Sequence, residues 1–297
     1  MRYRDFGNTG IRVSEIGVGC GGLGGERKQG LEPALERALE LGINFFDTCD
    51  TYAEGRSEET LGRFFRRHPR EKYVVCTKFG GVIDEEGWHR DISVAHLREA
   101  FASSCETLGV DYLDIYLVHT PPKDIAKEDD LFAELEKMKD AGKIRAYGLS
   151  LENNDFATEV VNATGSRAIE ITFSLLRQVP RAGFLDVAGE KGVGIVAKSP
   201  LARGLVTDSF RADGPPADDP RLVKMGPEKF EEHAKLHRKL RPILAANGRT
   251  MAQGALAWLL SFPTLSTVIP GITSLERIEE TAAVSGMKLA ETELTEL

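Results

Sequence analysis

Short runs of apolar and β-branched residues alternate along the chain with longer segments whose apolar positions have helical spacing. Eight such runs occur, and each is apolar enough for a strand that is covered on both faces. They are residues 16–19, 44–47, 73–78, 115–119, 144–150, 169–173, 194–198 and 267–270. Strands that alternate with helices indicate parallel strands joined by crossover helices, and eight such units predict an α/β fold of the (β/α)8, or TIM barrel, type.

Residues that favour helix ends separate these runs. Ser57, followed by Glu59 and Thr60, predicts the start of one helix. Ser93 predicts the start of another, which keeps a helical period and ends at Gly109. These boundaries support the assignment of the intervening segments to helices.

Two segments lie outside the alternation. Residues 3–6 and 11–13 flank the turn-forming residues 7–10, which predicts an N-terminal β-hairpin that caps the bottom of the barrel. Residues 202–247 follow the seventh strand and are too long for a simple connection. At this end of a barrel we expect a long loop to act as a lid, with residues 228–246 helical.

Length and charge limit the class of protein. A chain of 297 residues is long enough for one barrel domain over residues 1–297. The net charge of −8 comes from 46 acidic and 38 basic residues, and no basic stripe suggests a nucleic-acid surface. The first ten residues contain no apolar leader, and no apolar stretch is long enough to span a membrane. We therefore expect a cytoplasmic protein that binds neither nucleic acid nor membrane.

Cysteine and histidine spacing does not indicate a metal site. The four cysteines are widely spaced, contain no C-x-x-C pair and are expected to be reduced: Cys20, Cys49, Cys76 and Cys105. His233 and His237 lie one helical turn apart, but the glutamate of an H-E-x-x-H motif is missing. We interpret this pair as a solvated helix face, and no metal is expected.

Polar residues gather where the predicted strands end. Asp47 ends the second strand, Lys78 the third and His119 the fourth, and Tyr52 follows Asp47 in the next loop. Taken singly, each has a structural explanation, such as a turn cap, a surface ammonium or a packing residue. Together they face one mouth of the barrel, where charged groups must either be paired with one another or serve a function. This grouping predicts a catalytic site.

The four residue types suit proton transfer beside a carbonyl group. A phenol with a pKa of about 10 is a weak acid, but a neighbouring ammonium such as that of Lys78 lowers this pKa. Asp47 would keep the lysine charged and fixed, and His119 would orient the oxygen of the substrate. None of these groups supplies a hydride, so a redox reaction here requires a cofactor.

Three segments resemble motifs of the aldo-keto reductase superfamily. Residues 46–62 (FDTCDTYAEGRSEETLG) resemble the motif with the catalytic Asp and Tyr. Residues 76–80 (CTKFG) resemble the lysine motif, and residues 108–119 (LGVDYLDIYLVH) the segment that ends in the catalytic histidine. The resemblance extends over nearly the full chain and implies an oxidoreductase that moves a hydride between NAD(P)(H) and a carbonyl or alcohol. Tyr52 would be the general acid in reduction.

The resemblance also implies a cofactor site. Residues 199–204 (SPLARG) resemble the family's pyrophosphate loop, and residues 268–281 (VIPGITSLERIEET) the segment at the adenosine end. Arg277 stands where the family often has an arginine facing the 2′-phosphate, which favours NADPH, with NADH possible. The expected cofactor-binding residues are Gly19, Cys20, Ser150, Glu170, Lys198, Ser199, Pro200, Leu201, Gly204, Ile269, Gly271, Arg277 and Glu280.

Several positions depart from the family pattern. Leu151 stands in place of an Asn, Glu170 of a Gln, and Lys198 of the aromatic residue that stacks on the nicotinamide. Residues 271–273 lack a basic residue, and Thr281 replaces a further Asn. Glu170 and Lys198 would lie close enough to pair, either as a structural ion pair or as groups that bind an acidic substrate or form a Schiff base.

These departures leave alternatives to an oxidoreductase that acts on sugars or small aldehydes and ketones. A lyase, isomerase or dehydratase would use Lys198 and Glu170 on the same scaffold. A cofactor-sensing binding protein is a third reading, against which the four intact catalytic residues argue. The substrate depends on the loops around Gly21, Trp88 and residues 120–123 and 202–247. Trp88 is expected to line the substrate site, and the sequence does not indicate an oligomeric state.

Overall fold

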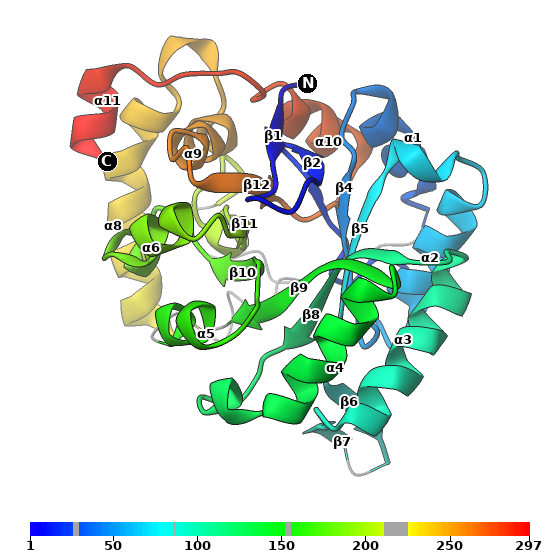
Figure 1. The fold of residues 1–297 in the computed structure, drawn as a ribbon. Helices are drawn as coiled ribbons and strands as arrows, with labels where there is room; N and C mark the ends of the chain where they lie inside the picture. Colours follow the sequence, from blue (N-terminus) through cyan, green and yellow to red (C-terminus); the bar gives the residue numbers. More distant parts are fainter. Residues whose placement is uncertain (26–29, 86, 152–155, 211–224) are drawn as a thin grey trace.

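The barrel is seen in a computed structural model that describes residues 1–25, 30–85, 87–151, 156–210 and 225–297. Within these residues, eight parallel strands each pair with the next (Figure 1). They are β3 (Val18–Gly19), β4 (Phe45–Asp47), β5 (Val74–Phe79), β8 (Leu113–His119), β9 (Ile144–Leu151), β10 (Ala168–Thr172), β11 (Gly194–Lys198) and β12 (Leu265–Ile269). Parallel bridges from Ile16 to Val268 and from Gly19 to Gly271 join the first strand to the last. The predicted (β/α)8 barrel is confirmed.

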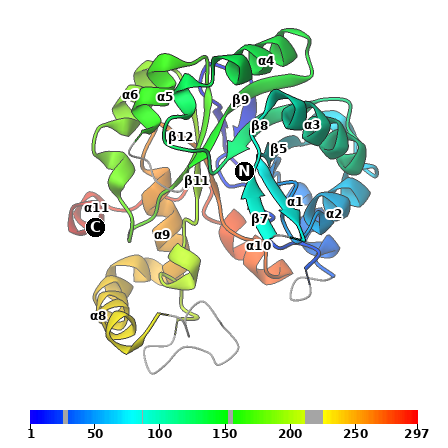
Figure 2. The same ribbon diagram turned by 90° about the horizontal axis from the view of Figure 1, so that it is seen from below.

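Helices surround the strands, as Figures 1 and 2 show. The α-helices are α1 (Glu32–Glu40), α2 (Arg56–Phe65), α3 (Val94–Leu108), α4 (Asp129–Asp140), α5 (Ala157–Ala163), α6 (Phe184–Glu190), α8 (Pro227–Leu244), α9 (Met251–Leu260), α10 (Leu275–Ala282) and α11 (Glu291–Glu296). Short 3-10 helices are η2 (Arg70–Lys72), η3 (Ile125–Lys127), η4 (Val179–Arg181), η5 (Ala202–Gly204) and η6 (Ala246–Gly248). None of the helices in the described ranges combines the length and apolar character that crossing a bilayer requires.

One of the two predicted helix starts is confirmed. The Ser93 side chain caps α3, and Gly109 ends that helix with a φ of 69°. The prediction that Ser57 opens a helix is wrong, because α2 begins one residue earlier and Gly55, with a φ of 87°, is its N-cap. The Ser57 hydroxyl instead donates to the backbone carbonyl of Cys20 at 3.0 Å. A tertiary contact uses the hydroxyl that the sequence pattern assigned to a cap.

The inside of the barrel is apolar in its lower layers. Side chains alternate between the two faces of each strand, so every second residue faces inward. One buried cluster contains the inward-facing residues Phe45, Val74, Cys76, Ile115, Leu117, Ala146, Ala168, Val196 and Ile269. The predicted N-terminal hairpin, β1 (Tyr3–Asp5) and β2 (Arg12–Ser14), is confirmed. Its residues Phe6, Ile11 and Val13 belong to the same cluster, so the hairpin seals the bottom.

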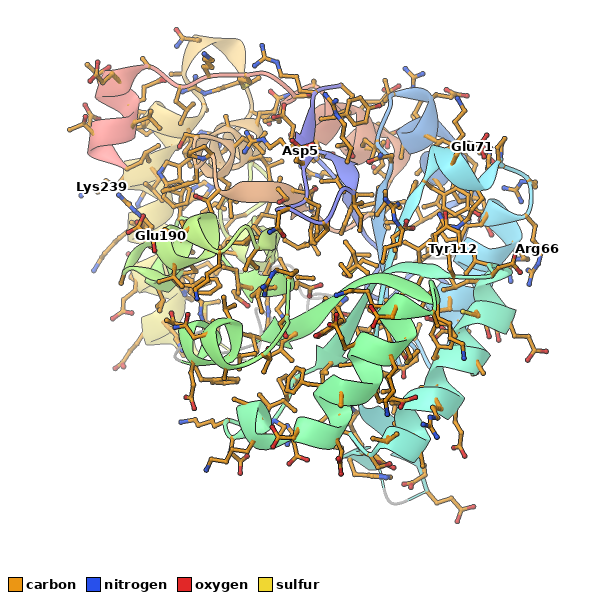
Figure 3. The ribbon with its side chains drawn as sticks, in the orientation of Figure 1. Asp5, Arg66, Glu71, Tyr112, Glu190 and Lys239 are labelled. Carbon is orange, nitrogen blue, oxygen red and sulfur yellow. The ribbon has the colours of Figure 1, made fainter. Side chains whose placement is uncertain are left out.

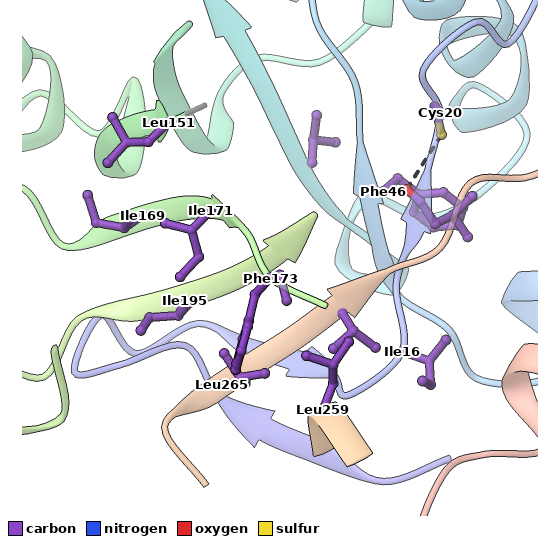
Figure 4. Close-up of a cluster of buried hydrophobic side chains, with 14 of the residues drawn as sticks. Ile16, Cys20, Phe46, Leu151, Ile169, Ile171, Phe173, Ile195, Leu259 and Leu265 are labelled. Atoms are coloured by element: carbon purple, nitrogen blue, oxygen red, sulfur yellow. Dashed lines mark hydrogen bonds between the residues drawn. The ribbon is translucent and has the colours of Figure 1, made fainter. Parts of the chain in front are cut away.

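A second apolar cluster fills the space between strands and helices. Ile169 and Ile171 of β10 and Ile195 of β11 belong to it, and Figure 4 shows them with other members. The residue between the two isoleucines of β10, Glu170, belongs to the opposite, inward face. Polar side chains such as Arg66 and Lys239 lie at the outer edge of the molecule (Figure 3). The alternation of side chains between the two faces of each strand therefore decides which residues point into the barrel and reach its mouth.

A hairpin after β5 was not predicted from the sequence. β6 (Gly81–Asp84) and β7 (Gly87–Arg90) pair in antiparallel fashion, although Gly81 is the one buried residue of these two strands. Trp88 of β7 is 51% exposed, so it is not a core residue. A short strand without an apolar face has no hydrophobic period from which it could be identified.

The long segment after β11 is helical where expected. α8 confirms the helix predicted over residues 228–246, and Figure 2 shows it at the outer edge next to α9. The prediction that His233 and His237 form a solvated face is wrong for His237, which is 6% exposed. Its Nε2 atom lies 3.0 Å from the carbonyl oxygen of Thr207, and its ring packs on Phe210. The proline-rich residues 213–220 lie outside the described residues.

Strand pairing leaves no room for a side chain at Gly148. This residue pairs with Ala168, and a Cβ atom on it would overlap the backbone oxygen of Ala168. We expect Gly148→Ala to lower the free energy of unfolding by about 3 kcal/mol or more, measured by denaturant unfolding. In Gly189→Ala, the new Cβ would lie 3.6 Å from Thr264, so this helix variant should be unchanged or slightly more stable. Equal unfolding midpoints for both variants would contradict the strand register.

Behind the barrel wall, Glu58 is buried between α2, β5 and α3. Its carboxylate accepts hydrogen bonds from Thr77 Oγ1 at 2.6 Å and from Ser104 Oγ at 3.2 Å. Burial raises the pKa of Glu58 to about 7, although both hydrogen bonds oppose this rise. Glu58 therefore ionises near neutral pH in the folded protein.

This raised pKa makes stability depend on pH. A carboxyl whose pKa rises on folding stabilises the folded state below its unfolded pKa of 4.5, and this contribution is lost as the pH approaches 7. The difference corresponds to about 3 kcal/mol between pH 4 and pH 8. We expect Glu58→Gln to remove this decrease in denaturant unfolding, whereas the exposed-site variant Glu59→Gln should keep it. A decrease of the same size in Glu58→Gln would show that another group is responsible.

Candidate active site

A fully buried ammonium lies at the upper end of the barrel. Lys78 of β5 is 0% exposed, and its Nζ atom donates to Asp47 Oδ1 at 2.5 Å and to the backbone oxygen of Thr48 at 2.8 Å. Asp47 ends β4, the strand next to β5. The predicted contact between these two residues is confirmed.

A second carboxylate reaches the same ammonium from the opposite side of the barrel. Glu170 Oε2 lies 3.2 Å from Lys78 Nζ, although β10 is not adjacent to β5 in the sheet. Glu170 Oε1 accepts a hydrogen bond from Ser150 Oγ at 2.9 Å and lies 3.7 Å from Lys198 Nζ. The predicted Glu170–Lys198 pair is confirmed, and the same glutamate also binds Lys78.

Together, the inward-facing polar residues of β4, β5, β9, β10 and β11 form one connected layer. We call Asp47, Lys78, Ser150, Glu170 and Lys198 the charged layer; all five side chains are buried. It lies on the apolar lower layers, because these residues follow the inward-facing apolar positions along their strands. Its charges are held by contacts within the layer and with the backbone.

The contacts within the charged layer determine how its groups ionise. Burial favours the neutral amine of Lys78, but Asp47 and Glu170 outweigh it and raise the pKa well above the ordinary value. Burial also acts on Glu170, but Lys78 and Lys198 lower its pKa to about 2. For Asp47, burial and the Glu170 carboxylate raise the pKa, and Lys78 opposes them. Lys78 is therefore charged, and of the two acids Asp47 takes up a proton more readily.

Tyr52 and His119 lie beside the charged layer. The Tyr52 ring centroid is 5.0 Å from Lys78 Nζ, and the ring meets the His119 imidazole edge to face at 5.8 Å. Burial raises the pKa of the Tyr52 phenol well above its ordinary value, although Lys78 opposes the rise. The sequence led us to expect a lowered pKa, and this expectation is wrong because burial outweighs the ammonium. Tyr52 is thus a protonated phenol next to a cation.

Cys49 is a neighbour of the site that the sequence analysis did not single out. Its Sγ atom lies 3.3 Å from His119 Nδ1 and 3.1 Å from Asp50 Oδ1. Burial raises the pKa of the thiol well above its ordinary value, so the group remains neutral. The one sequence feature that could have indicated a role for Cys49 is its position two residues after Asp47.

Four of the expected cofactor-binding residues lie at the seam between β3 and β12. These are Gly19, Cys20, Ile269 and Gly271. The backbone N–H of Gly19 donates to Pro270 O at 2.9 Å, and the N–H of Ile272 donates to Gly19 O at 3.1 Å. These bonds between the first and last strands close the barrel. They lie next to the charged layer, because β11, which carries Lys198, pairs with β12.

The other expected cofactor contacts lie on a turn and a helix. Ser199, Pro200, Leu201 and Gly204 form the turn after β11, in which three non-glycine residues have positive φ angles: Ser199, Ala202 and Arg203. Such strained backbone is found most often at functional sites. Arg277 and Glu280 lie on α10, where their side chains form an ion pair. Glu280 also accepts a hydrogen bond from Thr250 Oγ1 at 2.6 Å.

One group of side chains in the described part of the chain has the spacing of metal ligands. Atoms of Asp47, Cys76 and Glu170 lie within 4.8 Å of one another. The ammonium of Lys78 contacts both carboxylates and already supplies the positive charge between them. The closeness of the two carboxylates is therefore explained by their ion pairs with Lys78.

Comparison with known proteins identifies the family. The sequence profile described as "Aldo/keto reductase family" matches residues 15–297. The chain is 32% identical to the "Uncharacterized oxidoreductase YqkF" of Bacillus subtilis over 100% of this chain and 95% of that protein. It is 28% identical to the "NADH-specific methylglyoxal reductase" of Escherichia coli, covering 99% of this chain and 97% of that one.

A solved structure agrees with these relatives. The holo form of the aldo-keto reductase AKR11C1 from Bacillus halodurans superposes with a TM-score of 0.85 and 27% identity. The match covers 100% of this chain and 95% of that one. Nothing in these comparisons favours the lyase, isomerase or dehydratase alternative. The chain belongs to the aldo/keto reductase family and is an NAD(P)H-dependent oxidoreductase.

Proposed function

We propose that this protein reduces the carbonyl group of a small aldehyde, ketone or sugar at the barrel mouth, with NADPH as the cofactor. Asp47, Tyr52, Lys78 and His119 are the proposed catalytic residues. The observation that supports this most strongly is the buried Lys78 ammonium, held by two carboxylates with the Tyr52 ring 5.0 Å away. When bound, the nicotinamide ring supplies the hydride.

Tyr52 is proposed to supply the proton. As the carbonyl carbon is reduced, negative charge develops on its oxygen, and a neighbouring acid must neutralise it. The Tyr52 phenol is protonated at neutral pH, since burial raises its pKa above the ordinary value. It would donate this proton only as negative charge develops on the substrate oxygen. The phenolate left behind would be stabilised by Lys78, whose own charge is kept by Asp47 and Glu170.

His119 is proposed to orient the carbonyl oxygen. Its imidazole contacts the Tyr52 ring and has the Cys49 thiol beside Nδ1 at 3.3 Å. These contacts hold the imidazole beside the Tyr52 ring, next to which the carbonyl oxygen is proposed to bind. A neutral imidazole whose Nε2 carries the proton would donate a hydrogen bond to the same oxygen that Tyr52 protonates.

The residues present fit a nicotinamide dinucleotide. The charged layer offers the Ser150 hydroxyl at the mouth, and the strained turn 199–204 offers backbone N–H groups of the kind that bind phosphate. At the end of the proposed cofactor site away from Ser150, Arg277 lies in the first turn of α10, where the helix dipole also favours an anion. We assign these three regions to the nicotinamide, the pyrophosphate and the adenosine end, respectively.

A preference for NADPH over NADH is proposed on the basis of Arg277. Its guanidinium pairs with Glu280 in the free protein and would bind the 2′-phosphate that NADPH has and NADH lacks. The same carboxylate would suit a ribose hydroxyl, and the Escherichia coli relative is named as NADH-specific. A cytoplasmic location, a single domain over residues 1–297 and Trp88 as a wall of the substrate site stay predictions.

Removal of the proposed acid should abolish turnover without loss of cofactor binding. We expect Tyr52→Phe to reduce carbonyls at least about a hundredfold more slowly than the wild type, because general acid catalysis is lost. The dissociation constant of NADPH should change by less than about threefold, since the phenol hydroxyl is proposed to meet the substrate rather than the cofactor. Steady-state rates and calorimetric titration measure the two quantities.

A matched control removes another phenol hydroxyl. Tyr112→Phe keeps the ring that packs on Arg70, far from the charged layer in the fold, and should have the wild-type rate. Tyr52→Phe with a wild-type rate would show that another group donates the proton.

The role of Arg277 can be tested by cofactor binding. We expect Arg277→Ala to weaken NADPH binding by about tenfold to a hundredfold, the usual value of charge-assisted hydrogen bonds to a phosphate. NADH binding should change little, because it has no 2′-phosphate. Arg98→Ala, which removes a surface arginine of α3, is the matched control. Equal loss of affinity for both cofactors would assign Arg277 a structural role instead.

A further inference from the structure

The β6–β7 hairpin follows directly on the strand that carries Lys78, and it contacts the loop that carries Tyr52. β6 begins at Gly81, three residues after Lys78. A Cβ atom on Gly81 would lie 2.8 Å from the indole Nε1 of Trp88 and 3.4 Å from Thr51 Cγ2. The Trp88 indole and Thr51 therefore meet at Gly81, and Thr51 directly precedes Tyr52.

Arg90 connects the same hairpin to the loop after His119. Its Nε atom donates to the backbone oxygen of Thr120 at 2.9 Å, and Thr120 directly follows His119. The guanidinium carbon of Arg90 lies 5.8 Å from the centroid of the Trp88 ring. The two residues are two positions apart on β7, so they share one face of the hairpin. This face places a cation and an aromatic ring beside the neighbours of Tyr52 and His119.

The Arg90 guanidinium forms no ion pair in the described part of the chain. Its one hydrogen bond there uses Nε, which leaves the Nη atoms without a partner, and Arg90 is exposed. Two acidic residues of this segment have other partners. Asp84 pairs with His89 at 3.4 Å, and Asp91 accepts a hydrogen bond from the backbone N–H of Ser93. The two terminal nitrogens of a guanidinium form a fork that matches a carboxylate or a phosphate.

We infer that the substrate is a small carbonyl compound with an anionic group, a carboxylate or a phosphate, which Arg90 binds. Trp88 and Ile83, directly opposite each other in the hairpin and about half exposed, would cover its carbon chain. This rests on the proposed function, because it requires the carbonyl group to lie at Tyr52 and His119. Arg90 is thus a specificity-determining residue that acts on the end of the substrate away from the reaction.

A purely structural role for Arg90 predicts a different result. If the guanidinium only held the backbone of Thr120, its removal would slow the turnover of charged and neutral substrates alike. The ratio of kcat/KM for a charged substrate to that for its neutral counterpart separates the two roles, since changes common to both substrates cancel in it.

The experiment measures this ratio for two pairs of substrates. Succinic semialdehyde and its methyl ester share one carbon chain, and only the first carries a carboxylate. Glyceraldehyde 3-phosphate and glyceraldehyde are the corresponding pair for a phosphate. In one of the pairs, the wild type should have a kcat/KM at least about fivefold higher for the charged member. That pair identifies the anionic group.

Removal of the guanidinium should abolish this preference. In Arg90→Met, the ratio for that pair should fall at least about fivefold, mainly through a higher KM for the charged member. Arg90→Gln removes the charge with a polar side chain and should act in the same way, which covers the case that the methionine variant fails to fold. Added salt should lower the ratio in the wild type and leave it unchanged in both variants.

A matched control removes a positive charge elsewhere. Lys143→Met lacks an exposed ammonium of the turn before β9 and should keep the wild-type ratio, which excludes an effect of total protein charge. An unchanged ratio in both variants at position 90, or a wild type that prefers neither charged substrate, overturns this inference alone. Absence of turnover with all four compounds overturns it together with the proposed function.

Discussion

A fully buried ammonium inside a barrel requires carboxylates in direct contact, because the desolvation of an unpaired charge costs more than the fold can offset. Lys78 imposes this constraint here. It determines that Asp47 on the neighbouring strand and Glu170 on the far side of the barrel both point at one atom. Glu170 in turn engages Ser150 and Lys198, so five strands contribute to a single network of ion pairs and hydrogen bonds. Tyr52 lies beside Lys78, which the other members of this network contact directly or through Glu170.

The fold makes this network possible through the two-residue period of its strands. On each strand of the layer, the inward positions below the mouth are apolar or, at Gly148, lack a side chain, and the last ones are polar. The hairpin β1–β2 closes the lower end with apolar side chains. The charged layer is consequently separated from water at the lower end of the barrel by apolar side chains. That arrangement gives the mouth its electrostatic strength, because water does not screen the charges from inside the barrel.

Sequence reasoning found the strands because each is a continuous apolar run, and it found Asp47, Lys78 and His119 because they end such runs. It also anticipated that Glu170 and Lys198 pair, since their strands are neighbours. The contact between Glu170 and Lys78 could not be predicted in this way, because strands three and six meet only across the closed barrel. The β6–β7 hairpin has no apolar period, and the buried roles of Ser57 and His237 depend on contacts with distant loops. These features depend on tertiary contacts, which the local pattern of apolar and polar residues does not reveal.

The central claim is that Lys78 organises a site in which a hydride and a proton reach the same carbonyl group. The most direct measurement uses NADPH with deuterium at both C4 positions of the nicotinamide and follows the label into the product, by mass spectrometry after a single turnover with an aldehyde. The account predicts that the wild type transfers the deuterium to the former carbonyl carbon, and that Lys78→Met binds the cofactor but transfers at least about a hundredfold more slowly. Product without the label, or label transferred at the wild-type rate by Lys78→Met, would contradict it.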